Sequence, residues 1–221
     1  MAHPQQAEFV STVRGYYPHI FSGARVLEVG SLDINGSVRE MFLNCNYTGA
    51  DLQIGPGVDL ACQGQVLEFP SSTFDTTISA ECMEHNPYWR ETLGNMLRMT
   101  KPDGMVLITC ATRGRLEHGT SRTNPDASPF TSAARWDYYR NLTARDIESA
   151  LNLSGWLSDW RFWVNHISKD LYFVGIRQGN GLKLNEEMCR QMNALYAMTS
   201  SAKAFRRGLK TKLFGDLWSR P

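Results

Sequence analysis

Short apolar runs alternate with helix-like segments between residues 25 and 110, and this alternation predicts strands joined by helices in a parallel sheet. The run from Met105 to Cys110 is almost continuously apolar, which is typical of a strand covered on both faces. Together the runs predict five strands, at residues 25–29, 47–51, 57–61, 74–79 and 105–110.

Two helices are predicted between these strands. The first opens at Asn35 and Gly36, and its apolar side consists of Val38, Met41 and Phe42. The second begins at Asn86-Pro87, an N-cap followed by a proline at the first helical position, and residues 101–104 (Lys-Pro-Asp-Gly) end it with a turn. Its predicted buried face consists of Trp89, Leu93, Met96 and Leu97.

The second half of the chain begins with an aperiodic stretch, residues 111–142, which is predicted to be a long functional loop or lid. A capping-box pattern at Thr143–Asp146 predicts a helix that ends at Gly155. Two further strands, 156–164 and 171–177, are expected to form a closing hairpin. The fold class is therefore α/β, with a doubly wound, mostly parallel seven-stranded sheet whose last strand is antiparallel.

From Leu184 onward, apolar residues at three- and four-residue steps predict one long amphipathic helix. Residues 182–221 are expected to be an extension of a domain that covers residues 1–181. The extension is basic, because it contains eight Lys and Arg but only three acidic residues. Three roles stay open for this helix: docking on the core, a homodimer contact, or attachment to a membrane surface.

The overall charge is balanced, with 23 Lys and Arg, 22 Asp and Glu, and a net charge of +1. This balance argues against nucleic acid as the main partner. The five cysteines are scattered and never form a Cys-x-x-Cys pair, so we expect reduced thiols in a cytoplasmic protein and no metal site. No apolar run approaches the length of a bilayer span, and no signal peptide is expected at the N-terminus.

Ligands of open α/β sheets bind beyond the carboxyl ends of the strands. Gly30 follows the first strand directly, where a missing side chain lets a ligand approach the backbone. Asp51 ends the second strand, and its carboxylate has lone pairs for both hydroxyls of a ribose. These positions suit a nucleoside-containing cofactor.

Four ordered motifs resemble those of class I S-adenosylmethionine-dependent methyltransferases. They are Glu28-Val-Gly30, Asp51, the block from Phe74 to His85, and Lys101-Pro-Asp-Gly104, within a resemblance that covers roughly residues 20–177. Small-molecule enzymes with a Glu-His pair after the fourth strand are the most similar type. The resemblance implies a Rossmann-like fold, S-adenosyl-L-methionine as cofactor and a small-molecule acceptor.

The resemblance also implies roles for nine residues in cofactor binding. The residues at the first strand would hold the amino-acid end of the cofactor, and Asp51 would bind its ribose. The other residues would contact the adenine or line the opposite wall of the pocket. The residues are Glu28, Gly30, Ser31, Asp51, Leu52, Gln63, Gly64, Ala80 and Glu81. The second glycine that is usual after the first strand is absent here, where the sequence is Gly30-Ser-Leu-Asp33.

Methyl transfer to a hydroxyl requires removal of a proton, and histidine is the natural base near neutral pH. His85 follows the fourth strand and is expected to line the reaction centre, and His118 in the long loop is expected to contact the acceptor. The loop is rich in arginine and aromatic residues, which suits an anionic or sugar-like acceptor. Its candidate substrate residues are Arg113, Tyr138, Tyr139 and Arg140.

The favoured function is O-methylation of a sugar, phenol or other metabolite. N- or C-methylation of a small molecule is an alternative, as are a nucleotide-dependent oxidoreductase and a binding module without catalysis. An oxidoreductase would normally have Gly-x-Gly-x-x-Gly at residue 30, and this chain does not. Thermal stabilisation of the protein by S-adenosylhomocysteine but not by NADH would favour a methyltransferase over an oxidoreductase.

Overall fold

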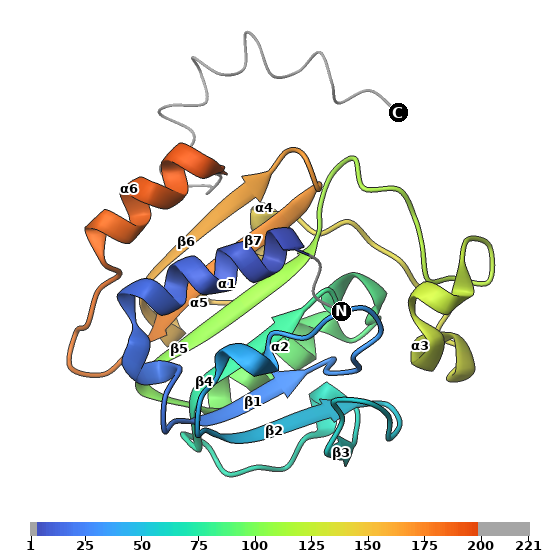
Figure 1. Ribbon diagram of the computed structural model, residues 1–221, viewed down its shortest axis with the longest axis horizontal. Coiled ribbons are helices and arrows are strands. Elements are labelled where there is room, and N and C mark those ends of the chain that lie inside the picture. Colours follow the sequence, from blue (N-terminus) through green and yellow to red (C-terminus); the bar gives the residue numbers. More distant parts are fainter. Residues whose placement is uncertain (1–3, 199–221) are drawn as a thin grey trace, which may run out of the picture.

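Eight strands form one sheet in the order β3-β2-β1-β4-β5-β7-β6-β8 (Figure 1). The structure, a computed structural model, describes residues 4–198. The strands are β1 (Arg25–Val29), β2 (Asn46–Asp51), β3 (Leu60–Ala61), β4 (Phe74–Ala80), β5 (Thr100–Ala111), β6 (Leu157–Asn165), β7 (Asp170–Arg177) and β8 (Ala197–Met198). The first five are parallel, and β7 is antiparallel to β5. This confirms the predicted seven-stranded sheet, to which the two-residue β8 is added at the β6 edge.

β5 includes the predicted turn at residues 101–104 as a bulge. Phe74 pairs with Thr100, but the next pair joins Thr76 to Met105, so four residues of β5 leave the ladder. Within the bulge, Asp103 has a φ of +57°. A left-handed residue of this kind reverses the chain locally and lets it rejoin the sheet.

Helices cover both faces of the sheet (Figure 1). On one face, α1 (Pro4–Tyr16) and α6 (Glu186–Leu195) pack over a core that includes Phe9, Met188 and Met192. On the other face, α2 (Trp89–Met99), α4 (Ala144–Ala150) and α5 (Leu153–Trp156) pack over a second core. All four residues of the predicted buried face of α2 are buried. Helix α1 was not expected from the sequence.

The helix predicted from Asn35 does not form. The segment contains only the 3-10 turn Arg39–Met41 (η2), although Val38 and Phe42 are buried as expected. Gly36 has a φ of +132°, outside the helical region, and no side chain caps the turn. Too few residues remain before β2 to offset the cost of nucleating a helix.

The capping box at α4 forms as predicted. The Thr143 hydroxyl accepts a hydrogen bond from the Asp146 amide, and the Asp146 carboxylate accepts one from the Thr143 amide. The helix ends at Ala150, earlier than predicted, because Asn152 caps the separate turn α5 by accepting a hydrogen bond from the Gly155 amide. Gly155 therefore lies inside α5 and does not end α4.

The expectation of one long C-terminal helix is wrong in the described part of the chain. α6 ends at Leu195, and Ala197 and Met198 then pair with β6. Met188 and Met192 are buried on the core, whereas Leu195 is 49% exposed. The basic part of the predicted helix lies outside the described residues. No helix within residues 4–198 is long and apolar enough to cross a membrane.

Residues 111–142 extend from the end of β5 past the carboxyl ends of the parallel strands, and they carry α3 (Pro129–Ala133) (Figure 1). This segment is mostly irregular, as predicted. The remaining short 3-10 turns are Pro18–Ile20, Gly64–Val66, Met83–His85 and Pro125–Ala127. Three of these, Gly64–Val66, Met83–His85 and Pro125–Ala127, contribute residues to the site described next.

Candidate cofactor and acceptor site

A pocket lies at the carboxyl ends of β1, β2 and β4, under the segment that carries α3. It encloses about 620 Å³ of space, part of which is open to solvent. Its lining comes from the strand ends, from the start of the β4–α2 connection, and from residues 127–136. The lining residues are Val29, Gly30, Leu32, Ile34, Ala50, Asp51, Leu52, Cys62, Gly64, Glu81, Cys82, His85, Asn86, Ala127, Ser128, Pro129, Phe130, Thr131 and Trp136.

Gly30 is the point where the chain leaves β1 and approaches the segment after β4. Its φ is +82°, and a Cβ at this position would lie 2.3 Å from the Cβ of Cys82. Only glycine fits both the backbone angle and the contact. The pocket therefore has bare backbone at this end, as a ligand that approaches the main chain requires.

Asp51 lies at the end of β2 with both carboxylate oxygens held by backbone amides. Oδ2 accepts a hydrogen bond from the Leu32 amide at 3.0 Å, and Oδ1 accepts one from the Leu52 amide at 2.7 Å. Burial raises the pKa of this carboxyl, and the two amide bonds oppose that effect. Each oxygen keeps a further lone pair, so the carboxylate can accept two hydroxyls of a ribose.

Apolar side chains form the walls next to Asp51. Leu32, Ile34 and Leu52 line the pocket from the strand-end loops, and Phe130 lines it from α3. The Phe130 ring lies so close to Gly55 that a Cβ there would be 2.8 Å from Cζ. These walls suit a flat, weakly polar ring such as adenine, so the residues present fit S-adenosylmethionine.

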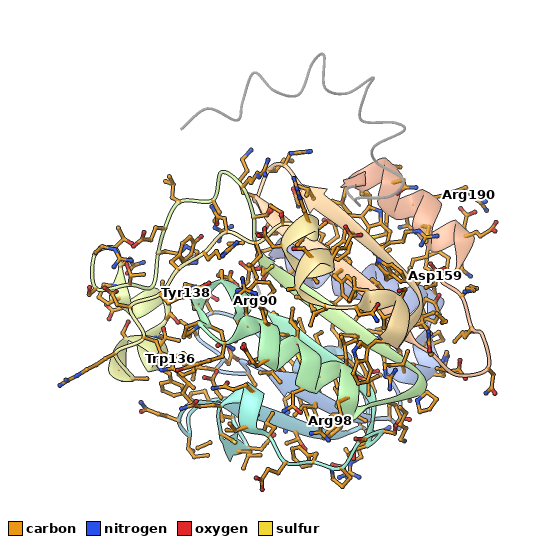
Figure 2. All side chains as sticks on the ribbon, turned by 180° about the vertical axis from the view of Figure 1, so that it is seen from behind. Arg90, Arg98, Trp136, Tyr138, Asp159 and Arg190 are labelled. Carbon is orange, nitrogen blue, oxygen red and sulfur yellow. The ribbon has the colours of Figure 1, made fainter. Side chains whose placement is uncertain are left out.

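Trp136 joins the segment that carries α3 to the body of the molecule. Its ring meets the Tyr88 ring edge-on, with centroids 5.5 Å apart. Figure 2 shows Trp136 and Tyr138 on the side of α3 that faces the sheet. Tyr138 itself packs against the core on the α2 face. Residues 127–136 therefore close the pocket as a lid with aromatic anchors.

Five of the nine cofactor residues proposed from the sequence line the pocket: Gly30, Asp51, Leu52, Gly64 and Glu81. The other four do not line it. Glu28 is buried in the sheet and accepts a hydrogen bond from the Tyr47 hydroxyl at 2.8 Å, Ser31 and Ala80 are buried, and Gln63 is exposed. Sequence reasoning missed Leu32, Ile34, Phe130 and Trp136 as lining residues.

Three potential ligand groups meet beside the pocket, from Glu84, His85 and His118, with one atom of each within 4.8 Å of the others. The two imidazole rings meet edge-on with centroids 4.9 Å apart. Tyr139 packs against both rings, at 5.4 Å from His85 and 5.0 Å from His118. The structure thus brings together the two histidines that the sequence singled out, along with Glu84, which it did not.

Burial dominates the electrostatics of this cluster. It lowers the pKa of His85 to about 3 and also lowers that of His118, so both imidazoles are neutral near physiological pH. Burial raises the pKa of Glu84 to about 7, and that of the adjacent Glu81 well above its usual value. The pKa of the Tyr139 hydroxyl is raised as well, mainly by burial and then by Glu84.

Of the four candidate substrate residues, only Tyr139 contacts the histidines. Arg113 is exposed on the loop, and Tyr138 packs on the core. Arg140 forms an ion pair with Asp146 at 2.7 Å, and its backbone amide donates to the Glu84 carbonyl. The arginine-rich composition of the loop therefore serves partly to hold the loop, as the ion pairs of Arg122 with Glu117 and Asp137 also do.

Comparisons with known proteins agree with this arrangement. Residues 20–108 match the family described as a methyltransferase domain. Among solved structures, phosphoethanolamine N-methyltransferase 2 of Haemonchus contortus with S-adenosyl-L-methionine is 16% identical, with a TM-score of 0.56 over 78% of this chain and 52% of that chain. The CurJ carbon methyltransferase is 18% identical, with a TM-score of 0.50 over 72% of this chain and 50% of that chain. No curated protein matches the sequence.

This chain spans about half the length of those two proteins. At such low identity the likeness establishes the fold, and the family match runs from before β1 into β5, so it covers the strand ends that line the pocket but not residues 127–136. The glycine after β1, the acid at the end of β2 and the apolar walls are arranged as a nucleoside cofactor requires. Residues 20–108 therefore match a methyltransferase domain, and the described chain has the Rossmann-like fold of proteins that include a methyltransferase solved with S-adenosyl-L-methionine.

Proposed function

We propose that the protein transfers a methyl group from S-adenosylmethionine to a hydroxyl group of a small-molecule acceptor. The observation that carries this proposal is a pair of neutral imidazoles: His85 lines the pocket, and the His118 ring packs against His85 beside it. A neutral imidazole accepts a hydrogen bond from a hydroxyl, whereas a charged one can only donate. The pair therefore favours an acceptor that arrives carrying a proton on oxygen.

The cofactor supplies an electrophilic methyl group, and the chain has to hold it in line with the acceptor. We place the ribose at Asp51, the adenine between Leu52 and Phe130, and the amino-acid end at Gly30. This order leaves the sulfonium end directed toward Glu81 and His85. Alignment of this kind supplies up to roughly 7–11 kcal/mol in favourable cases.

His118 is the side chain best placed to contact the acceptor oxygen. Its Nδ1 lies 3.0 Å from the Leu116 carbonyl oxygen, which can only accept a hydrogen bond. Nδ1 therefore carries the hydrogen, and Nε2 keeps its lone pair for the hydroxyl. Tyr139 packs against the His118 ring and limits its rotation.

The similar solved structures include an N-methyltransferase and a carbon methyltransferase, so the fold alone does not choose the acceptor atom. Sugars, phenols and hydroxy acids fit the proposal because each presents a hydroxyl beside an apolar or anionic body. An amine acceptor would be favoured by acidic side chains at the reaction centre, and both acids here, Glu81 and Glu84, have raised pKa values.

An acceptor panel with S-adenosylhomocysteine release as the readout tests the proposal. Phenols, vicinal diols and hydroxy acids are compared with matched compounds in which an amine replaces the hydroxyl. We expect turnover with at least one hydroxyl acceptor, and a large loss in His118→Phe but not in His166→Phe, because His166 is exposed away from the pocket. Turnover confined to the amines would contradict the proposal.

We also propose a cytoplasmic location, supported by the five cysteines, all of which are free thiols. A homodimer through the C-terminal segment and a membrane-surface contact remain hypotheses about residues beyond Met198. The part of that segment that is described, α6, packs on the core beside α1, where the Tyr16 hydroxyl donates a hydrogen bond to Gln191 at 2.9 Å.

A further inference from the structure

We propose that Glu84, His85 and His118 form a binding site for a divalent first-row transition cation at the acceptor end of the pocket. The site itself rests on the geometry of the three side chains. The role of the cation in catalysis rests on the proposed function. No metal is expected from the sequence, because the cysteines are not spaced as metal ligands and His118 is 33 residues away from His85 in the chain.

The three side chains are already close to the spacing of metal ligands. One atom from each lies within 4.8 Å of the other two. Ligand atoms that lie about 2.0–2.2 Å from one tetrahedral cation are roughly 3.4 Å apart from each other. Closing the triangle therefore takes movements of up to roughly an ångström, which rotations of the side chains supply.

Backbone groups orient two of the ligands. Oε1 of Glu84 accepts a hydrogen bond from the Ala111 amide at 3.0 Å, which leaves Oε2 for a cation. His118 donates from Nδ1 to the Leu116 carbonyl, which leaves Nε2. Metal sites usually contain such hydrogen bonds to the atom of each ligand side chain that does not bind the metal. These bonds fix the tautomer of a histidine and the orientation of the side chain.

The cluster also contains buried polar atoms that the described residues leave without a hydrogen-bond donor. They are Oε2 of Glu84 and both carboxyl oxygens of Glu81, and Nδ1 of His85 is buried without a partner as well. Glu84 and Glu81 interact with each other, so only a shared proton or a cation can satisfy the oxygens between them. A cation would also engage the imidazole nitrogens, which a shared proton would not.

The composition of the buried groups suits a cation too. Glu81, Glu84 and Asp170 are all buried, and Arg115, the basic side chain that reaches this region, bonds Asp170 at 3.2 Å. Within the described residues no basic side chain pairs with the Glu84 carboxyl, so its oxygens are available to a cation that would displace the proton.

Gly119 makes the approach of His118 possible. Its φ is +67°, and a Cβ there would lie 2.7 Å from Cε1 of His85 and 3.1 Å from Nδ1. Only a glycine lets the loop backbone pass this close to the His85 ring. The loop is thus built to bring the preceding residue, His118, to the two ligands that follow β4.

Two imidazoles and one carboxylate select the type of ion. Imidazole suits Zn²⁺, Fe²⁺ and Ni²⁺, whereas Mg²⁺ and Ca²⁺ prefer sites made only of oxygen. Three protein ligands leave open positions for an acceptor that offers two oxygens, such as a catechol, a vicinal diol or a hydroxy acid. A hydroxyl that binds there loses its proton to water more easily. Its oxygen then bonds to the methyl carbon, and the electron pair of the broken S–C bond stays on sulfur.

Titration of the chelator-treated protein with Co²⁺, followed by visible absorbance, tests the site without any need for turnover. We expect one site with the d–d bands of nitrogen and oxygen ligands. Affinity should fall at least about tenfold in Glu84→Gln, which keeps the acceptor for the Ala111 amide, and in His118→Phe, which keeps the ring contacts. His166→Phe is the matched control for exposed histidines and should bind like the wild type.

Binding of S-adenosylhomocysteine by each variant shows that it is folded. Equal Co²⁺ affinity in the wild type, Glu84→Gln and His118→Phe would overturn the proposal, as would a spectrum dominated by thiolate-to-cobalt charge transfer.

Turnover of a hydroxyl acceptor with and without chelator then tests the role of the cation. Loss on chelation and recovery with Zn²⁺ or Co²⁺ is expected. Turnover that survives chelation would overturn the catalytic role and leave His118 to act on the hydroxyl directly. Co²⁺ binding without turnover of any hydroxyl acceptor would instead count against the proposed function and leave the cation site intact.

Discussion

The ring of His118 meets the ring of His85 edge-on at 4.9 Å, although the two residues belong to different connections of the sheet. His85 ends the 3-10 turn Met83–His85 directly after β4, and His118 lies in the loop after β5. Because β4 and β5 are parallel neighbours, both connections leave the same edge of the sheet. This contact therefore lies at the ends of β4 and β5, whereas Asp51 ends β2 on the other side of β1.

The glycine beside this contact should be essential for activity. In Gly119→Ala the new methyl group would clash with His85 and with Ser128, each at 2.7 Å, and the positive φ adds strain of about 1 kcal/mol or more. We expect a large fall in kcat with S-adenosylhomocysteine affinity nearly unchanged.

Gly114→Ala is the matched control for this prediction. Gly114 lies in the same loop and also has a positive φ. The added methyl group would lie 3.6 Å from the nearest atom of the Lys169 side chain, which is an ordinary van der Waals distance. Equal activity losses in the two variants would show that backbone strain in the loop, and not the approach to His85, limits the reaction.

Asp51→Asn should weaken cofactor binding. The amide keeps one acceptor oxygen for a backbone N–H, but it presents an NH₂ group in place of the second oxygen and loses the negative charge. Hydrogen bonds to charged groups are worth about 1.5–3 kcal/mol, so the Kd for S-adenosylhomocysteine should rise tenfold or more. Calorimetry measures this directly, with Glu91→Gln on the exposed side of α2 as the control. Similar affinities in both variants would remove Asp51 from the site.

Phe130→Ala tests the lid formed by residues 127–136. The ring lines the pocket and packs close to Gly55, so its removal should raise the KM for S-adenosylmethionine. Because Phe130 is only partly buried, the loss of stability should be modest. Leu116→Ala, in the same loop but 85% exposed, should leave the KM unchanged. A lower melting temperature of Phe130→Ala with an unchanged KM would show that Phe130 contributes to packing and not to cofactor binding.

The pH dependence of stability should include a contribution from Asp75. Burial tends to raise the pKa of this carboxyl, but bonds from the Lys101 ammonium at 2.7 Å and the Arg25 amide at 2.8 Å outweigh it and hold the pKa below its usual value. A lowered pKa stabilises the fold above the unfolded value of about 3.9, and that stability is lost as the pH falls through the folded value.

Asp75→Asn should therefore be less stable than the wild type at neutral pH, with a difference that shrinks in acid. Both partners are more than a third exposed, so the difference should stay below about 1 kcal/mol. Urea unfolding at neutral and at acidic pH measures it. A difference that grows on acidification would contradict the assigned sign.

Sequence patterns predicted the sheet well because the signals of its strands are local. The bounds of β1 match, those of β2, β4 and β7 differ by one residue at one end, and those of β6 differ by one residue at each end. β5 begins earlier than predicted, at Thr100, because it includes the bulge. β3 is shorter than predicted because only Leu60 and Ala61 pair with β2. The helix from Asn35 failed because an apolar pattern over so few residues also fits a loop that buries Val38 and Phe42.

The site was less predictable from sequence. Gly30 and Asp51 stand out because they follow strands, but Phe130 and Trp136 lie in an aperiodic loop where no pattern marks an inward residue. Glu84 was missed as a ligand because its importance comes from burial beside Glu81 and from the approach of His118. Helix α1 did carry a signal, since Phe9, Val10 and Val13 are spaced for one helical face and are all buried.

The most direct test of the central claim is to follow the methyl carbon itself. The protein is incubated with S-adenosylmethionine labelled with ¹³C in the methyl group and with acceptors that carry both a hydroxyl and an amine. The ¹³C chemical shift of the product then identifies the atom that was methylated. We predict an O-methyl signal that is lost in His118→Phe and retained in His166→Phe. An N-methyl or C-methyl signal in its place would contradict the proposed function.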